Sequence, residues 1–149
     1  MSESSAFQTL KRNVCLPRDR FERVENGLGE GMPDVNYCME GAEGWIELKA
    51  PNLPARATTP LLKSQHQLSQ AQVNWFIRQK QARGRAFLYI ATTSDLLLIK
   101  RDDVVKHGLM LNELPLEELK QMFACWTLHQ SLKSARVQRW EDLREILIA

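Results

Sequence analysis

The segment 45–50, Trp-Ile-Glu-Leu-Lys-Ala, constrains the fold of this chain more than any other stretch. Side chains of an extended strand point alternately to opposite faces, so Glu47 and Lys49 share one face and the apolar residues between them share the other. The segment 34–39 alternates in the same way and begins with Asp34. Because Glu-Gly-Ala-Glu-Gly joins the two segments, we predict a hairpin that brings Asp34 beside Glu47.

The surrounding pattern predicts an α/β or α+β sheet domain built on these two strands. Apolar residues recur at helical spacing over 69–83 until Gly84, and two continuous apolar runs predict strands that are buried on both faces. The stretch 51–67 has no clear period and is expected to be a loop. We expect helices over 4–13 (capped by Ser4 or Ser5), 69–83, 116–131 and 140–147, and strands over 21–26, 34–39, 45–50, 86–92 and 96–100.

Length and composition fit an ordinary soluble globular protein. A chain of 149 residues without an obvious linker is expected to form a single domain over 1–149. The formal net charge of +2 is too small to indicate a nucleic-acid binder by itself. Basic residues do gather at 11–23, 78–85 and 100–101, where they either contact phosphates or form solvated faces of ordinary elements.

Cysteine usage indicates a reducing compartment, and no signal peptide is apparent in the N-terminal segment. The three cysteines, Cys15, Cys38 and Cys125, are odd in number, far apart and without CxxC spacing, which argues against a disulfide framework and a zinc ribbon. The N-terminal residues do not form a signal peptide, and no apolar run approaches the roughly 20 residues of a membrane span. We therefore expect a soluble cytoplasmic protein without a membrane partner.

The predicted cluster of charges points to metal-assisted chemistry on a phosphate. Two carboxylates as close as Asp34 and Glu47 repel each other unless a cation lies between them. Hard oxygen ligands suit Mg²⁺ or Mn²⁺, with water and a substrate phosphate completing the shell. Each residue has an ordinary structural alternative, because Glu-x-Lys is common on exposed strands and Pro-Asp is common in turns. Their combination on adjacent strands favours a site.

These residues also resemble a known family. Pro33-Asp34 followed by Glu47-x-Lys49 resembles the signature of the PD-(D/E)xK nuclease superfamily. The further runs Gly-Met-Pro-Asp-Val, Ile-Glu-Leu-Lys-Ala-Pro and Leu-Ser-x-x-Gln-x-x-Trp look like its VRR-NUC branch and the small phage Holliday-junction-resolvase-like relatives. The resemblance implies a restriction-endonuclease-like core in αβββαβ order, a mixed sheet flanked by helices, over about 1–103. A helical C-terminal extension over about 104–149 lies outside it.

The resemblance also implies roles for individual residues. Asp34 and Glu47 would bind the metal together with the main-chain carbonyl of Leu48, and Lys49 would be the catalytic lysine. Gln72 would help to hold the lysine, the water or the phosphate. Gln72 has a structural alternative, because Ser-Gln-Ala-Gln at 69–72 is also a capping box that would stabilise the helix by itself.

Two further groups of residues complete the expected site. Some family members add a carboxylate from the first helix, where this chain offers only Glu3, and Glu25 ahead of the glycine-rich turn is an attractive substitute. Arg56, Lys63 and His66 lie in the loop beside the expected site and are candidates for phosphate contacts on DNA, although a solvated loop is the alternative.

The resemblance therefore implies a Mg²⁺-dependent DNA endonuclease in which Mn²⁺ can substitute, with no small-molecule cofactor. A preference for branched DNA and a C2 homodimer, with the C-terminal helices as the dimer surface, follow from the family and from the two active sites that symmetric cutting requires. It would act in the cytoplasm, or in the host cytoplasm if phage-encoded. The alternatives are a monomeric nicking or exonucleolytic repair nuclease, and a catalytically idle DNA-binding protein of the same fold.

Overall fold

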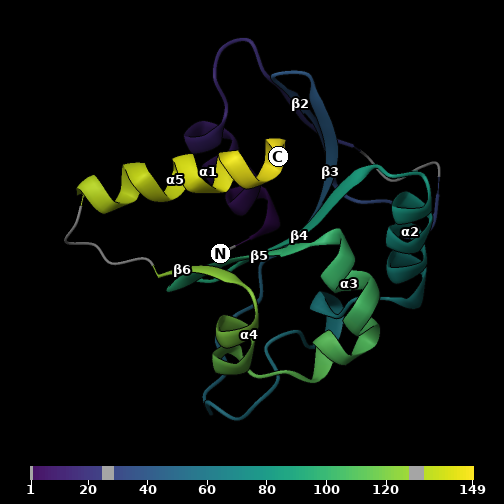
Figure 1. Ribbon diagram of the computed structural model, residues 1–149. Coiled ribbons are helices and arrows are strands. Elements are labelled where there is room, and N and C mark those ends of the chain that lie inside the picture. Colours follow the sequence, from purple (N-terminus) through teal and green to yellow (C-terminus); the bar gives the residue numbers. More distant parts are fainter. Residues whose placement is uncertain (1, 25–28, 128–132) are drawn as a thin grey trace.

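A computed structural model describes residues 2–24, 29–127 and 133–149 of the chain. It contains a six-stranded mixed sheet in the order β1-β2-β3-β4-β5-β6 (Figure 1). Neighbouring strands are antiparallel except β3 and β4, which are parallel and connected through a helix. The strands are β1 (Arg20–Arg23), β2 (Val35–Met39), β3 (Ala42–Lys49), β4 (Arg85–Ala91), β5 (Asp95–Lys100) and β6 (Ala124–Thr127).

Helices cover both faces of the sheet, which confirms the predicted α/β class (Figure 1). One apolar core lies between the sheet and the helices α1 and α5, and a second lies between the sheet and α2, α3, η2 and α4. Apart from the short η1, the elements as far as β4 follow the predicted αβββαβ order. The helices are α1 (Glu3–Val14), η1 (Ser64–His66), α2 (Gln70–Gln81), α3 (Arg101–His107), η2 (Gly108–Glu113), α4 (Leu116–Met122) and α5 (Lys133–Ile148).

The predicted hairpin is present, with a tighter turn than expected. Strand β2 ends at Met39 and β3 begins at Ala42, three residues earlier than predicted. The turn residues Glu40 and Gly41 both have positive φ (50° and 79°), the backbone conformation that a two-residue hairpin turn of the favoured twist requires. The register pairs Val35 with Ile46. Asp34 precedes Val35 and Glu47 follows Ile46, so these two residues are adjacent at the point where the pairing of β2 and β3 ends.

The predicted alternation of β3 is confirmed. Ile46, Leu48 and Ala50 are buried in the core beneath α1 and α5. Glu47 and Lys49 therefore project to the opposite face, where α2 lies. The sheet thus presents its charged pair to a helix and its apolar residues to the main core.

Helix ends and the first strand differ from the predictions by a few residues. Helix α1 starts at Glu3, and its cap is Ser2 rather than Ser4 or Ser5, because the Ser2 hydroxyl accepts a hydrogen bond from the Ser5 N–H at 3.0 Å. Strand β1 starts one residue earlier than predicted and ends at Arg23, and the predicted positions 25–26 lie outside the described residues. Helix α2 ends at Gln81, ahead of the predicted end at residue 83.

The expected C-terminal helix over 116–131 is wrong beyond Met122. Strand β6 occupies Ala124–Thr127 and pairs antiparallel with β5, and residues 128–132 lie outside the described residues. The outer edge of β5 offers backbone N–H and C=O groups to a neighbouring strand. That tertiary partner overrides the helical pattern, so the extension contributes a strand to the sheet and is not helical throughout.

The last helix completes the core. Trp140, Leu143 and Leu147 on α5 are buried against the sheet. The Tyr37 hydroxyl donates a hydrogen bond of 2.6 Å to the Leu147 carbonyl, and Arg144 forms an ion pair with Asp19 ahead of β1. The inner face of α5 is therefore used within the chain. In the parts of the chain that the structure describes, no helix combines the length and apolar character that crossing a bilayer requires.

Replacing Leu143 by alanine tests whether α5 is part of the core. We expect the free energy of unfolding to fall by about 2–5 kcal/mol, because the truncated side chain leaves a cavity between the helix and the sheet. Urea unfolding followed by circular dichroism measures the change. Glu145→Ala, at an exposed position of the same helix, is the matched control and should change stability little. Equal, small effects of both changes would show that α5 is not needed for the core.

Candidate active site

The two carboxylates predicted to meet do so at the adjoining ends of β2 and β3. The half-buried Asp34 precedes β2, and its Oδ2 accepts a hydrogen bond of 3.0 Å from the Leu48 N–H. Glu47 is only 4% exposed. Burial and the neighbouring Asp34 carboxylate raise the pKa of the Glu47 carboxyl to about 8, against the lowering effect of the Lys49 charge. Without a cation, Glu47 therefore keeps its proton at neutral pH.

Lys49 lies on the same face and is enclosed by oxygen atoms. Its side chain is as deeply buried as that of Glu47, at 4% exposure. The ammonium nitrogen Nζ lies 3.1 Å from the Gln67 carbonyl oxygen, 3.3 Å from Gln72 Oε1 and 3.6 Å from Glu47 Oε1. Three oxygen atoms thus fix the position of the ammonium group beside the carboxylates.

Gln72 connects the helix start to both charged residues. Its N–H donates to the Ser69 hydroxyl at 3.1 Å, and its Oε1 accepts from the Ser69 N–H at 2.9 Å, which is the predicted capping box. The same Oε1 accepts from Lys49, and Nε2 donates to Glu47 Oε1 at 2.8 Å. Capping and contact with the charged pair are therefore compatible, because one carboxamide serves both.

A close backbone contact holds the turn before β2 against α2. Gly31 has a φ of +78°, and a Cβ atom there would lie 2.2 Å from the Ala71 carbonyl oxygen and 2.6 Å from the Gln72 N. Only glycine fits at this distance. The contact fixes the segment that carries Asp34 relative to the helix that carries Gln72. This packing role was not expected from the sequence, in which the glycine-rich stretch is typical of a flexible turn.

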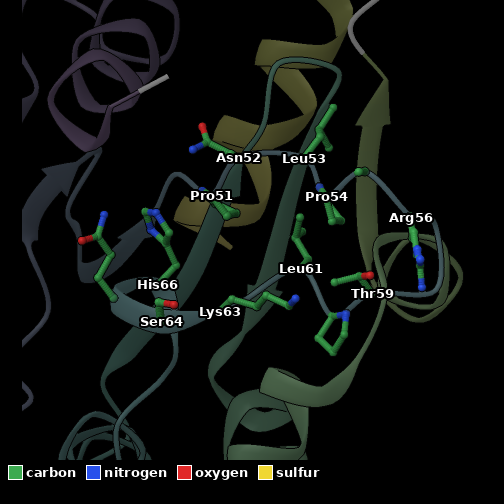
Figure 2. Close-up of a pocket in the computed structure, with 13 residues that line it drawn as sticks. Pro51, Asn52, Leu53, Pro54, Arg56, Thr59, Leu61, Lys63, Ser64 and His66 are labelled. Carbon is green, nitrogen blue, oxygen red and sulfur yellow. The ribbon is translucent and has the colours of Figure 1, made fainter.

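The loop between β3 and α2 forms two adjoining hollows beside these residues. Most of the loop, 51–66, lines a hollow of about 550 Å³ that includes Arg56, Lys63 and His66. Figure 2 shows His66 at one side of this hollow, Arg56 at the opposite side and Lys63 between them. His66 also lines the neighbouring hollow, together with Glu3 and Ala50. The three predicted phosphate-binding residues are thus gathered around one hollow, which borders the end of β3.

His66 has one unusual feature. Its Nδ1 is buried and, among the described residues, has no hydrogen-bond partner. Buried polar atoms in folded proteins nearly always have a partner. His66 lines both hollows and is followed by Gln67, whose carbonyl oxygen accepts the bond from Lys49.

The two candidates for an additional carboxylate, Glu25 and Glu3, differ in what the structure describes of them. Glu25 lies outside the described residues. Glu3, in the first turn of α1, is among the charges that raise the pKa of Glu47, so the acid of the first helix does approach the site. Within the described parts of the chain, no group of three or more His, Cys, Asp and Glu side chains is arranged to hold a metal ion. The side-chain donors available to a cation there are thus the pair Asp34 and Glu47.

This arrangement is suited to a hard divalent cation. Two neighbouring carboxyl groups, one of them protonated because it is buried next to the other, would both ionise around a cation. Mg²⁺ is commonly bound through one or two carboxylates, with waters and a phosphate filling the remaining positions. The main-chain carbonyl of Leu48 adds a further oxygen on the side of β3 that faces Asp34. The Leu48 N–H points toward Asp34, and in a β-strand the N–H and C=O of one residue lie on the same edge.

Comparisons with known proteins add a structural likeness. No family model and no curated protein sequence matches the chain. Among solved structures, the 1.6 Å structure of Hjc, a Holliday junction resolvase from the archaeal hyperthermophile Archaeoglobus fulgidus, is 16% identical. The match covers 67% of this chain and 74% of that chain, with a TM-score of 0.45. Overlap and identity this low leave the function to be argued from the residues of the chain itself.

The raised pKa of Glu47 predicts how pH affects stability in the absence of metal. The unfolded chain releases this proton near the ordinary glutamate pKa of 4.5, whereas the folded chain keeps it until about pH 8. Stability should therefore fall between about pH 4.5 and pH 8, and Glu47→Gln should remove that decrease. Each unit of pKa difference is worth about 1.4 kcal/mol, so the variant should be more stable by a few kcal/mol at alkaline pH.

Denaturant unfolding at a series of pH values in EDTA measures this difference. Glu43→Gln provides the matched control, because Glu43 is on the same strand and its side chain is 64% exposed. The control should follow the pH profile of the wild type. A Glu47→Gln profile parallel to that of the wild type would show that Glu47 is not a buried, protonated acid.

Proposed function

We propose that this protein is a metal-dependent nuclease that hydrolyses phosphodiester bonds in DNA. The single observation that carries the proposal is the buried contact of Glu47 with Asp34 and Lys49 at one end of the central strands. A buried acid and a buried amine, such as Glu47 and Lys49, destabilise a fold unless they serve a ligand or pair with each other. Here the acids are adjacent to each other, which suits a cation, and the amine lies beside them.

Asp34, Glu47 and the carbonyl oxygen of Leu48 would hold the metal, which is Mg²⁺ in the proposal, with Mn²⁺ able to substitute. When bound, the metal would polarise the phosphoryl oxygen and lower the pKa of a bound water. Among the described residues, Glu3 does not complete a group of three metal ligands with Asp34 and Glu47. Glu25, which lies outside the described residues, stays the candidate for an additional carboxylate. The deprotonation of Glu47 on binding couples metal affinity to pH.

The remaining side chains would position the reacting groups. Lys49, held by Gln67 and Gln72, would orient the attacking water or neutralise charge on the phosphate in the transition state. Gln72 would keep Lys49 and Glu47 in a fixed relation, since its two carboxamide atoms contact one each. Because the capping box anchors Gln72 to the helix, its carboxamide is already in place before substrate arrives.

The loop hollows would receive the DNA backbone. Arg56, Lys63 and His66 line the hollow that residues 51–66 form, and they offer cationic or hydrogen-bonding groups to phosphates.

The finer parts of the proposal rest on the sequence resemblance to the VRR-NUC and Holliday-junction-resolvase-like nucleases. They are endonucleolytic cutting, a preference for branched DNA, action in the cytoplasm and a C2 homodimer. The inner face of α5 is used within the chain, so a dimer contact through the C-terminal helices would use outward-facing residues of that region.

Incubation with supercoiled plasmid and with a synthetic four-way junction tests the activity. We expect cleavage with Mg²⁺ or Mn²⁺ and none with EDTA. Glu47→Ala and Lys49→Ala should each reduce the cleavage rate by on the order of 100-fold or more, since each removes a group at the reacting centre. Glu43→Ala, on the exposed part of the same strand, should leave the rate close to that of the wild type.

Each other result has a definite meaning. Absence of metal-dependent cleavage on both substrates would sink the enzyme proposal, and binding without cleavage would favour an idle DNA-binding protein. Cleavage that survives Glu47→Ala would show that the metal site is misassigned. Product end-labelling separates endonucleolytic from exonucleolytic cutting, and light scattering separates a monomer from a dimer.

A further inference from the structure

A second cluster of charged side chains lies toward the other end of the central strands from the carboxylates. Two basic runs that are separate in the sequence, Arg83 with Arg85 and Lys100 with Arg101, meet in one hollow of about 390 Å³. They meet because β4 and β5 are antiparallel, with Phe87 opposite Lys100. In the sequence alone, such runs fit either phosphate contacts or ordinary solvated faces.

Of the four cationic side chains, two have polar partners within the protein and two have no ion pair among the described residues. Arg101 donates to the Gly84 carbonyl oxygen at 2.8 Å and pairs with Asp102, while Arg85 donates to the main-chain oxygen of Ala149 at 3.0 Å. Arg83 and Lys100 are exposed, and neither has an ion pair with any residue that the structure describes.

The acids in this hollow do not cancel its charge. Its lining holds four cationic side chains and two carboxylate side chains, Asp102 and Asp103. Asp102 is already paired, with Arg101 at 3.0 Å and with Lys80 at 3.8 Å. The hollow keeps a net positive charge even when the Ala149 oxygen is counted as a third negative group, and its two unpaired cations lie at the surface.

The backbone at Arg83 gives independent support for a role of its side chain. Arg83 follows the end of α2 with a φ of +61°, the left-handed conformation that usually falls to glycine after a helix. A residue with a Cβ atom in this conformation lowers the stability of the fold by roughly 1 kcal/mol relative to glycine. The glycine of this turn is Gly84, one residue after the left-handed position that Arg83 occupies.

We propose that this hollow binds the phosphodiester backbone of nucleic acid, at a position remote from the carboxylates. The inference rests on the proposed function only in taking DNA as the ligand. On β4, Arg85 lies opposite Gly44 and Ile90 lies opposite Lys49, a separation of five residues. At about 3.3 Å per residue this is roughly 17 Å, or about five base-pair steps of a duplex. One DNA arm is long enough to reach from the carboxylates to the hollow.

Fluorescence anisotropy with a labelled duplex, in EDTA so that no cleavage occurs, tests the proposal. The double variant Arg83→Gln/Lys100→Gln should bind about tenfold more weakly near physiological salt. The slope of log affinity against log salt should decrease in magnitude by about one for each phosphate that the variant no longer neutralises. The matched control Arg12→Gln/Lys106→Gln removes the same charge from two exposed positions outside the hollow.

A single variant separates binding from stability. Arg83→Gly should be at least as stable as the wild type to urea, because glycine suits the left-handed backbone, yet should bind DNA more weakly. Weaker binding by this variant cannot then come from unfolding.

The outcomes separate this proposal from that of the active site. Unchanged binding in the Arg83→Gln/Lys100→Gln variant, or an equally large decrease in the control, overturns the hollow as a DNA site and leaves the nuclease proposal standing. If the Arg83→Gln/Lys100→Gln variant binds DNA more weakly but the wild-type protein cleaves no substrate, the hollow is supported as a DNA site and the nuclease proposal is overturned. Calorimetry with inorganic phosphate is the remaining arm. Saturation of the hollow by phosphate alone, with DNA binding indifferent to Arg83 and Lys100, identifies a small-anion site and overturns the proposal.

Discussion

The carboxyl group of Glu47 is buried beside a second carboxylate, and the neighbouring side chains are arranged around that constraint. A carboxyl group removed from water loses hydration, and a like charge alongside it makes ionisation still less favourable. Three features offset this: the amide of Gln72 donates to the carboxyl group, the ammonium of Lys49 lies 3.6 Å away, and a proton stays bound up to about pH 8. The site is therefore held together without metal, in a form that a cation can convert by displacing one proton.

The topology of the sheet explains why these groups come from adjacent elements. A parallel connection from β3 to β4 requires a crossover, and α2 supplies it on the face that Glu47 and Lys49 occupy. The N-terminus of α2 thus lies at the end of β3, where its capping glutamine reaches both charged residues. Gly31 closes the arrangement from the other side, because only a residue without a side chain lets the turn before β2 contact the first turn of α2.

The sequence was sufficient for those features that depend on local periodicity. Strand alternation placed Glu47 and Lys49 on one face, and the hairpin between the two strands placed Asp34 beside Glu47. The features that failed depend on distant partners. The helical pattern after residue 116 gives way to β6 because β5 offers an open edge, which no local pattern reveals. The contact of Gly31 with α2 and the meeting of Arg83 with Lys100 likewise depend on packing and register between separate elements.

The acceptor of the Lys49 ammonium group is the main-chain oxygen of Gln67, and this has a consequence for how the loop before α2 can change. Every type of amino acid carries that oxygen, so substitutions at position 67 leave the acceptor in place. An insertion or deletion close to this end of the loop, in contrast, would displace it. Asn112 also fixes the position of this segment. Its side chain donates a hydrogen bond to the Leu68 carbonyl and accepts one from the Leu68 N–H, and Leu68 directly follows Gln67. The contact with Lys49 thus leaves the type of residue at position 67 free, but it restricts the length of the loop where the chain returns to the site.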